Sequence, residues 1–281
     1  MKILRQLASR ASQIESIPVL SLLSPSVKRA PTNVEIEGFL EAQTLAQNST
    51  KEVQSLIREG WTEIQAARLL ETVLRDHGVK NFFHLPFVWF GENTRFANVK
   101  NYKDFQATKR RVHENEVVIL DVAPILNNYT CDIGHTFCLG ENKEYNEAMA
   151  FLAEIRSLIP ALFDGKISGD QIWKDVDDII KSRGYDNIHS QYPMSVLGHR
   201  MHVAPAGAGN IKLLNFEWSS YWNLLSRGMF GQVLSPTFQG GLEGVWAIEP
   251  HIGRPKFGVK FEEILIVDSK CPRWLNEKAL V

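Results

Sequence analysis

The sequence predicts an α+β protein built from two halves that share one order of elements. In each half, two helical patterns precede apolar segments with the character of strands, and the half ends in a strand–turn–strand hairpin. Each hairpin carries one carboxylate on either strand, in a run that is otherwise apolar. An apolar strand tolerates such a charge only where another group compensates it. The pattern therefore predicts a largely antiparallel protein whose two hairpins share a charged site.

The first half follows a Ser/Pro-rich stretch, residues 1–34, which is typical of a linker or an N-terminal extension. A helical pattern then covers residues 34–60. Thr62 and Gln65 have the spacing of a capping box, which opens a second helix that ends at Gly78.

The remaining elements repeat this plan. We expect a strand over residues 82–91 and the first carboxylate hairpin over residues 116–137. Helical patterns follow at 146–163 and 168–184, and the second hairpin covers 244–267. No residue-level repeat accompanies them, so the predicted symmetry is one of elements only.

An aromatic segment, residues 204–240, separates the last helical pattern from the second hairpin. We interpret it as a helix packed on the core or on a second subunit, which makes a homodimer an expectation. The alternative is an aromatic lid over the charged site, because long insertions beside a site often serve its function.

Composition and charge exclude several classes of protein. The chain has 281 residues and a formal net charge of -1, which argues against a broad nucleic-acid-binding surface. Its three cysteines contain no CxxC pair, so we expect no disulfide framework and a reducing compartment. No apolar run reaches the ~18 residues of a membrane helix. We therefore interpret the chain as a cytoplasmic protein without a membrane partner, acting on a small molecule or a short peptide.

Five residues with oxygen or nitrogen donors stand out as metal ligands. The first hairpin supplies Asp121 and Asp132, the second supplies Glu249 and Glu262, and a Gly-His pair between them supplies His199. Four carboxylates and one imidazole favour two divalent ions, Mn(II), Fe(II) or Co(II), and are compatible with Zn(II). Two ions a few ångström apart can hold a bridging water, lower its pKa and polarise a carbonyl group.

The motifs around these residues resemble a known superfamily. They read V-V-I-L-D and Y-T-C-D-I-G-H-T-F in the first hairpin, L-G-H at the histidine, and W-A-I-E-P-H and G-V-K-F-E-E-I-L-I-V in the second. Their order is similar to that of the creatinase/aminopeptidase or pita-bread superfamily (M24 metallopeptidases), which includes methionine aminopeptidases, aminopeptidase P and prolidases. The resemblance implies a curved sheet with outer helices, pseudo-twofold symmetry and a catalytic domain over residues 35–281. It also implies that the separate N-terminal domain of prolidase is missing.

The resemblance gives each ligand a role: Asp121 binds one ion, His199 and Glu249 bind the other, and Asp132 and Glu262 bridge both. It makes Glu249 the candidate general base. Glu263 is the alternative to Glu262, because a slip of one residue reverses the face of a strand. Alternation along the strand favours Glu262.

Two features depart from the peptidases of this superfamily. A histidine usually follows the glycine before the first hairpin, and here that position falls near Asn98. The motif at His199 reads G-H-R-M-H, which brings His202 earlier than the second histidine of the family. Those imidazoles contact the substrate in the family, so we expect Asn98 and His202 to border it, with His84 and His251 as further candidates.

The leading hypothesis is a dinuclear metal-dependent hydrolase of the aminopeptidase type, acting on a small peptide or a peptide-like amide. The missing histidines leave two alternatives open. One is a non-peptidase metalloenzyme for a specialised small molecule, with oxidative chemistry if the metal is iron. The other is a binding module that has lost turnover.

Overall fold

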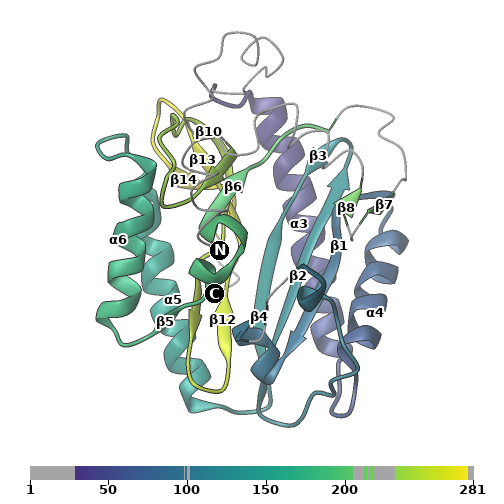
Figure 1. Cartoon of the computed structure of the whole chain (residues 1–281). Helices are drawn as coiled ribbons and strands as arrows, with labels where there is room; N and C mark the ends of the chain where they lie inside the picture. Colours follow the sequence, from purple (N-terminus) through teal and green to yellow (C-terminus); the bar gives the residue numbers. More distant parts are fainter. Residues whose placement is uncertain are drawn as a thin grey trace.

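Two antiparallel sheets stand side by side in the molecule, and helices cover the outer side of each (Figure 1). The computed structural model describes residues 29–97, 99, 102–204, 212–213, 216–217 and 232–277. The helices α3 (Asn33–Leu56) and α4 (Glu63–Asp76) pack against the first sheet. The helices α5 (Lys143–Leu162) and α6 (Gly169–Ser182) pack against the second. The predicted α+β class and its two similar halves are therefore confirmed.

The helices begin at capping signals in the sequence. Gln65 donates its backbone N–H to the Thr62 side chain and accepts the Thr62 N–H on its own side chain, so the predicted capping box is present. Thr32 forms the same motif at the start of α3. That helix stops short of Gly60, because Ile57 leaves it with an extended backbone and buries its side chain in the core.

The first sheet contains β1 (Asn81–Phe90), β2 (Glu116–Leu126), β3 (Tyr129–Thr130), β4 (Ile133–Leu139), β7 (Lys212–Leu213) and β8 (Phe216–Glu217). The predicted first hairpin is formed by β2 with β3 and β4, and Asp121 pairs with Gly134 across it. Asn127 and Asn128 make its turn with positive φ angles, as a tight hairpin turn requires. Asp132 lies in the break between β3 and β4.

The second sheet contains β6 (Gly198–Arg200), β9 (Val233–Leu234), β10 (Gly244–Ile248), β13 (Glu263–Val267) and β14 (Arg273–Trp274). A smaller sheet contains β5 (Asp186–Asn187), β11 (His251–Gly253) and β12 (Gly258–Lys260). The prediction of one hairpin over 244–267 is incomplete, because β11 and β12 form a second hairpin between the paired strands β10 and β13. Pro250, which has no N–H to donate, separates β10 from β11. Glu249 and Glu262 therefore lie at the corners where the chain passes between the two sheets.

An aromatic cluster joins the two halves. It contains Phe87, Trp89, Phe96 and Ile119 from the first half and Ile188 from the second. The Gly258 N–H in β12 also donates to the Thr94 hydroxyl at 2.7 Å. Burying side chains from both halves in one cluster fixes their relative position.

Most of the aromatic segment 204–240 lies outside the described residues, including Trp218, Tyr221, Trp222 and Phe230. Phe238 is described, and its ring packs edge-on against Trp246 in the second core, with 5.5 Å between centroids. Phe238 therefore packs on the core outside any helix, whereas Gln232 and Val233 of the same segment line a cavity. In the part of the chain that the structure describes, no helix is both long enough and apolar enough to span a membrane.

His189 is a fully buried histidine behind the smaller sheet. Its Nδ1 accepts the backbone N–H of His251 at 3.4 Å, and its ring lies edge-on to Trp173. Burial disfavours the charged imidazolium and lowers the pKa of His189 to about 3, although the charge of Asp177 opposes this shift. The native protein therefore holds His189 neutral.

We expect acid to destabilise the protein through His189. Its pKa rises from about 3 in the folded chain to the ordinary 6.5 when it is exposed, so the unfolded state binds the extra proton. The contribution of His189 to the free energy of unfolding is fully present above pH 6.5 and is lost as the pH drops toward 3. At pH 5 this loss is ~2 kcal/mol. Urea unfolding of chelator-treated protein between pH 7 and 5 should show a weaker pH dependence for His189→Gln. The control is His113→Gln at an exposed histidine, and equal pH dependence in all three proteins would contradict this assignment.

Candidate metal centre and cavity

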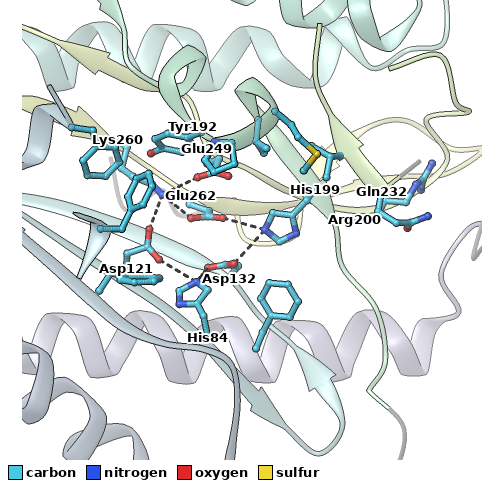
Figure 2. A pocket seen from close by; sticks show the side chains of 18 of the residues that line it. His84, Asp121, Asp132, Tyr192, His199, Arg200, Gln232, Glu249, Lys260 and Glu262 are labelled. Atoms are coloured by element: carbon cyan, nitrogen blue, oxygen red, sulfur yellow. Dashed lines mark hydrogen bonds and ion pairs between the residues drawn. The ribbon is translucent and has the colours of Figure 1, made fainter. Parts of the chain in front are cut away.

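All five predicted ligands line one cavity of about 240 Å³ (Figure 2). They come from distant segments of the chain: Asp121 from β2, Asp132 from the break before β4, His199 from β6, and Glu249 and Glu262 from the two sheet corners. The two hairpins therefore bring their carboxylates to one place, as the sequence pattern suggests.

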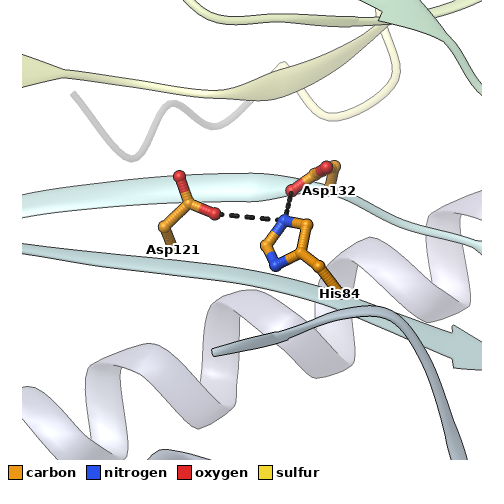
Figure 3. Close-up of side chains that lie close together, drawn as sticks. All are labelled: His84, Asp121 and Asp132. Carbon is orange, nitrogen blue, oxygen red and sulfur yellow. Dashed lines mark hydrogen bonds and ion pairs between the residues drawn. The ribbon is translucent and has the colours of Figure 1, made fainter. Parts of the chain in front are cut away.

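Two groups of donor atoms share Asp132, and Glu249 belongs to neither of them. One group is His84, Asp121 and Asp132, shown in Figure 3, and the other is Asp132, His199 and Glu262. Within each group the donor atoms lie within 4.8 Å of one another. His84 Nε2 is 3.2 Å from Asp132 Oδ1, and His199 Nε2 is 3.2 Å from Asp132 Oδ2. Each oxygen of Asp132 thus faces one imidazole.

His84 belongs to this donor set, whereas the sequence indicated a substrate contact. The pairing of β1 with β2 is irregular between Phe82 and His84 and again between His84 and Phe87, so simple alternation does not predict where His84 points. Its Nδ1 lies 2.9 Å from the neighbouring backbone carbonyl oxygen, which orients Nε2 toward the carboxylates. Burial opposes the charged ring, but Asp132 and Asp121 raise the pKa of His84 to about 9. The ring is therefore a positive partner of both carboxylates unless another cation takes that role.

Lys260, which the sequence analysis missed, lies among the carboxylates. Its Nζ is 2.7 Å from Asp121 Oδ2 and 2.9 Å from Glu262 Oε2. It is also 3.0 Å from Glu249 Oε2, and the lysine side chain is only 1% exposed. Burial lowers the pKa of Lys260, but Asp121 and Glu262 outweigh burial and raise the pKa well above its ordinary value. A signal was present, because Lys260 precedes Glu262 by two residues and alternation places both on one strand face.

Gly134 and Thr136 on β4 fix the position of this lysine. A Cβ atom at position 134 would lie 2.6 Å from Lys260 Cε and 3.2 Å from Glu262 Cβ, so only glycine leaves room for the lysine stem. The Thr136 hydroxyl donates to the Lys260 carbonyl at 2.6 Å and accepts the Lys260 N–H at 3.1 Å. The space at Gly134 and the hydrogen bonds of Thr136 therefore fix the position of the ammonium group.

The donors present fit divalent cations. Glu262 Oε1 is buried without a hydrogen-bond partner in the described part of the chain, and it lies 3.6 Å from His199 Nε2. A buried acceptor of this kind is costly unless a donor or a cation reaches it. Burial and the nearby Glu262 raise the pKa of Glu249 to about 8, although Lys260 opposes the shift. Glu249 therefore exchanges its proton close to neutral pH.

The residues predicted to border the substrate lie in different places. His202 lines the cavity, with its ring 6.0 Å from Phe83. His251, the other candidate for this side, is not among the lining residues. It is buried behind Tyr192, whose hydroxyl lies 2.8 Å from His251 Nδ1 and which lines the cavity instead. Asn98 lies outside the described residues.

Most of the remaining cavity wall is apolar and aromatic, although Arg200 and Gln232 also line it. Phe87 stacks on Trp89 with 5.4 Å between ring centroids. Phe96 lies 4.7 Å from Trp89 and 5.5 Å from Tyr192, again between centroids. Further lining residues are Phe83, Phe105, Pro193, Met194, Val196 and Val233. A molecule bound beside the charged groups would therefore place an apolar part against this wall.

Residues 37–269 match the sequence profile of metallopeptidase family M24. The chain belongs to this family. Its relatives include uncharacterized peptidases of Staphylococcus aureus: one from strain bovine RF122 / ET3-1 is 24% identical over 83% of this chain and 62% of the relative. Another, from strain MW2, is 24% identical over 92% of this chain and 65% of the relative. The M24 chain thus spans less than two thirds of the length of these relatives.

Solved structures show the same fold at low sequence identity. The X-Pro aminopeptidase of Thermotoga maritima superposes with a TM-score of 0.69 at 20% identity, over 90% of this chain and 64% of that one. The prolidase of Pyrococcus furiosus gives 0.68 at 20% identity, over 90% and 66%. The methionine aminopeptidase of T. maritima gives 0.61 at 16% identity, over 89% and 99%. The pita-bread fold and the superfamily predicted from the motifs are therefore confirmed.

Glu263, the alternative ligand, has a different partner in this M24 chain. Arg156 Nε is 3.0 Å from Glu263 Oε1, and its Nη2 is 2.7 Å from Oε2, in a buried bidentate pair. The Arg156 guanidinium also lies over the Trp274 ring, 4.8 Å from its centroid. Glu262, not Glu263, therefore faces the cavity.

Substituting each of these two adjacent glutamates should distinguish the metal ligand from the residue that stabilises the fold. Glu263→Gln leaves Arg156 charged and unpaired in the interior, so we expect it to lose ~3–5 kcal/mol of unfolding free energy and to keep its metal. Glu262→Gln should lose bound Mn²⁺ with a smaller loss of stability. Urea unfolding and elemental analysis of Mn²⁺-equilibrated protein give the two readouts. Metal loss in Glu263→Gln with metal retained in Glu262→Gln would reverse the assignment.

Proposed function

We propose that this M24 protein is a metal-dependent hydrolase of the aminopeptidase type. It would cleave the amide bond of a short peptide or peptide-like molecule next to an apolar side chain. The observation that carries this proposal is that two groups of hard donors open onto one aromatic-walled cavity. Family membership and the peptidase names of the relatives support the reaction class.

We infer that the centre takes divalent cations, up to two, with Mn(II), Fe(II) or Co(II) favoured by the donor types and Zn(II) compatible. His84 and Asp121 would hold one cation, and His199, Glu249 and Glu262 the other, with Asp132 shared between them. Bound there, the cations would polarise the substrate carbonyl and activate a water molecule.

We assign proton transfer to Glu249. A cation bound beside it would hold Glu249 as a carboxylate, which is the form that accepts a proton from a water molecule. Its side chain lines the cavity together with His202 and the Tyr192 ring. The hydrogen bond between the Tyr192 hydroxyl and His251 fixes the orientation of that ring.

The cavity limits the size and character of the substrate. Its volume of about 240 Å³ lies below the ~300–1,000 Å³ of typical drug-sized pockets. An aromatic wall favours the burial of hydrocarbon. We therefore expect a short substrate with an apolar side chain.

A second candidate function is iron-dependent oxidation of a small apolar molecule. The imidazole and carboxylate donors of each group are ligand types that also suit Fe(II). Oxygen consumption by the Fe(II)-loaded protein, without peptide cleavage, would favour this candidate over the hydrolase.

Peptide cleavage tests the proposed reaction. With the Mn²⁺-loaded full chain and tetrapeptides that differ only in the first residue, we expect release of Leu, Met and Phe to exceed that of Gly, Asp and Lys. Burial of such a side chain is worth ~1.5–3 kcal/mol, or about 10- to 150-fold in kcat/KM. Mass spectrometry of the released amino acids gives the rates. Equal rates across the series would refute the apolar preference, and no cleavage of any peptide would refute the peptidase assignment.

Asp132→Asn tests whether the centre carries this activity. Asn keeps the size of the side chain but loses the charge shared by both donor groups. We expect bound Mn²⁺ to fall, and kcat/KM to fall by more than ~100-fold, because even partners outside the ligand shell cost ~10–100-fold. The matched control is Asp164→Asn at an exposed position, which should keep both properties. Full metal content and activity in Asp132→Asn would place the reaction elsewhere.

A further inference from the structure

A short turn at one side of the cavity has an unusual backbone. Apart from glycine and asparagine, only Phe96, Met194 and Ser195 have positive φ angles among the described residues, at 55°, 62° and 55°. Asparagine tolerates this left-handed region, whereas a larger side chain is strained in it. Phe96 and Met194 both line the cavity, and Ser195 directly follows Met194. All three strained residues therefore lie at the cavity or next to it.

Hydrogen bonds hold the turn of Met194 and Ser195 from behind. The Ser195 N–H donates to the Tyr192 carbonyl at 2.8 Å, and the Ser195 hydroxyl donates to the Ser190 carbonyl at 2.9 Å. The Trp173 indole N–H in α6 donates to the Ser195 carbonyl at 2.7 Å. A strained backbone persists only where its surroundings determine it in this way, and such strain gathers at binding sites. The turn is therefore a fixed support for the side chain of Met194.

Met194 is the adjustable part of the apolar wall. Tyr192, at the start of the turn, lies across the carboxylates from His84 on β1 (Figure 2), so the turn faces the wall that β1 forms. The other apolar lining residues in the described chain are aromatic residues, proline and valine, whose side chains are stiff. Methionine is unbranched, and its three rotatable bonds and thioether let it fit irregular apolar surfaces. Only this side chain can therefore adapt to an apolar group that enters the cavity.

We propose that Met194 is a specificity-determining residue of this protein. Its backbone holds the side chain at the cavity, and the thioether contacts the apolar side chain of the substrate and limits the size of the group that fits. The cavity of about 240 Å³ leaves little room, so shortening this one side chain should admit larger groups. This inference rests on the proposed function, from which it takes the peptide substrate, and it adds the residue that selects among apolar side chains.

Competition between two peptides tests the proposal. The Mn²⁺-loaded full chain receives an equimolar mixture of tetrapeptides that begin with Leu and with Phe, and mass spectrometry of the released amino acids gives the ratio of their kcat/KM values. We expect Met194→Ala to raise the Phe-to-Leu ratio at least ~10-fold, because burying two further methylene groups changes an affinity by about this factor. The control is Met149→Ala on α5, at a methionine that is also partly exposed and packs on the second core. It should keep the wild-type ratio, and an unchanged ratio in Met194→Ala would overturn the proposal.

Urea unfolding tests the role of the backbone. Glycine adopts the left-handed region without strain, so Met194→Gly should unfold at a higher urea concentration than Met194→Ala. At a position with an ordinary backbone, the alanine variant would be the more stable of the two. That order would show that the turn does not constrain Met194 and would overturn this part of the proposal.

Methyl spectra distinguish a failure of this inference from a failure of the proposed function. In the Zn²⁺-loaded full chain with ¹³C-methyl-labelled methionine, the signal that Met194→Ala lacks belongs to Met194. It should shift on addition of L-leucinamide and stay in place with glycinamide. A protein that shows this shift but cleaves no peptide would refute the peptidase assignment and keep Met194 as the contact for apolar groups. No shift with either compound would overturn the inference, whether or not peptides are cleaved.

Discussion

The compensation of buried negative charge is the constraint on which the rest of this structure depends. Asp121, Asp132, Glu249 and Glu262 are all buried around one cavity. Four carboxylates without partners would exclude one another from a low-dielectric interior, because desolvation and repulsion both oppose ionisation. The other groups at the centre compensate this negative charge. Lys260 and the two imidazoles supply positive charge from the protein, and the remaining oxygens are available to cations.

Three of these four carboxylates lie where the regular pairing of strands is interrupted. Asp132 lies in the break between β3 and β4, and Glu249 and Glu262 lie at the corners around β11 and β12. At such points the backbone is released from regular pairing, so a side chain can turn into the cavity without disrupting a strand. Asp121 and His199 come from regular strands, although Asp121 pairs with Phe87 next to the irregularity of β1. The same irregularities that end the strands therefore assemble the site.

The locally encoded features could be predicted from the sequence. Short stretches of sequence specify the capping box at Thr62, the first hairpin and the five predicted metal ligands. The structure contains the capping box and the hairpin, and the five ligands line one cavity. The alternation argument for Glu262 over Glu263 also agrees with the structure, in which Glu263 pairs with Arg156.

Features that depend on tertiary register were harder to predict. His84 lines the cavity, where a place beside the substrate was expected, but its turn toward the carboxylates occurs at an irregularity of β1 that no periodic pattern shows. The extra hairpin of β11 and β12 begins after Pro250, whereas a single hairpin over residues 244–267 was expected from the sequence. Tyr192 reaches the cavity because the short segment around it packs on Phe96, a contact between halves that the sequence does not record.

The aromatic cluster between the halves has a consequence for how the molecule comes apart. Phe96 touches Trp89 in its own half and Tyr192 in the other, and Ile188 completes the cluster. Neither half can withdraw without exposing these rings to water, so the penalty for separating the halves is added to that for unfolding either one. The two similar halves should therefore lose their structure in one cooperative transition. Because the same rings form the cavity wall, a bound ligand would strengthen that cooperativity.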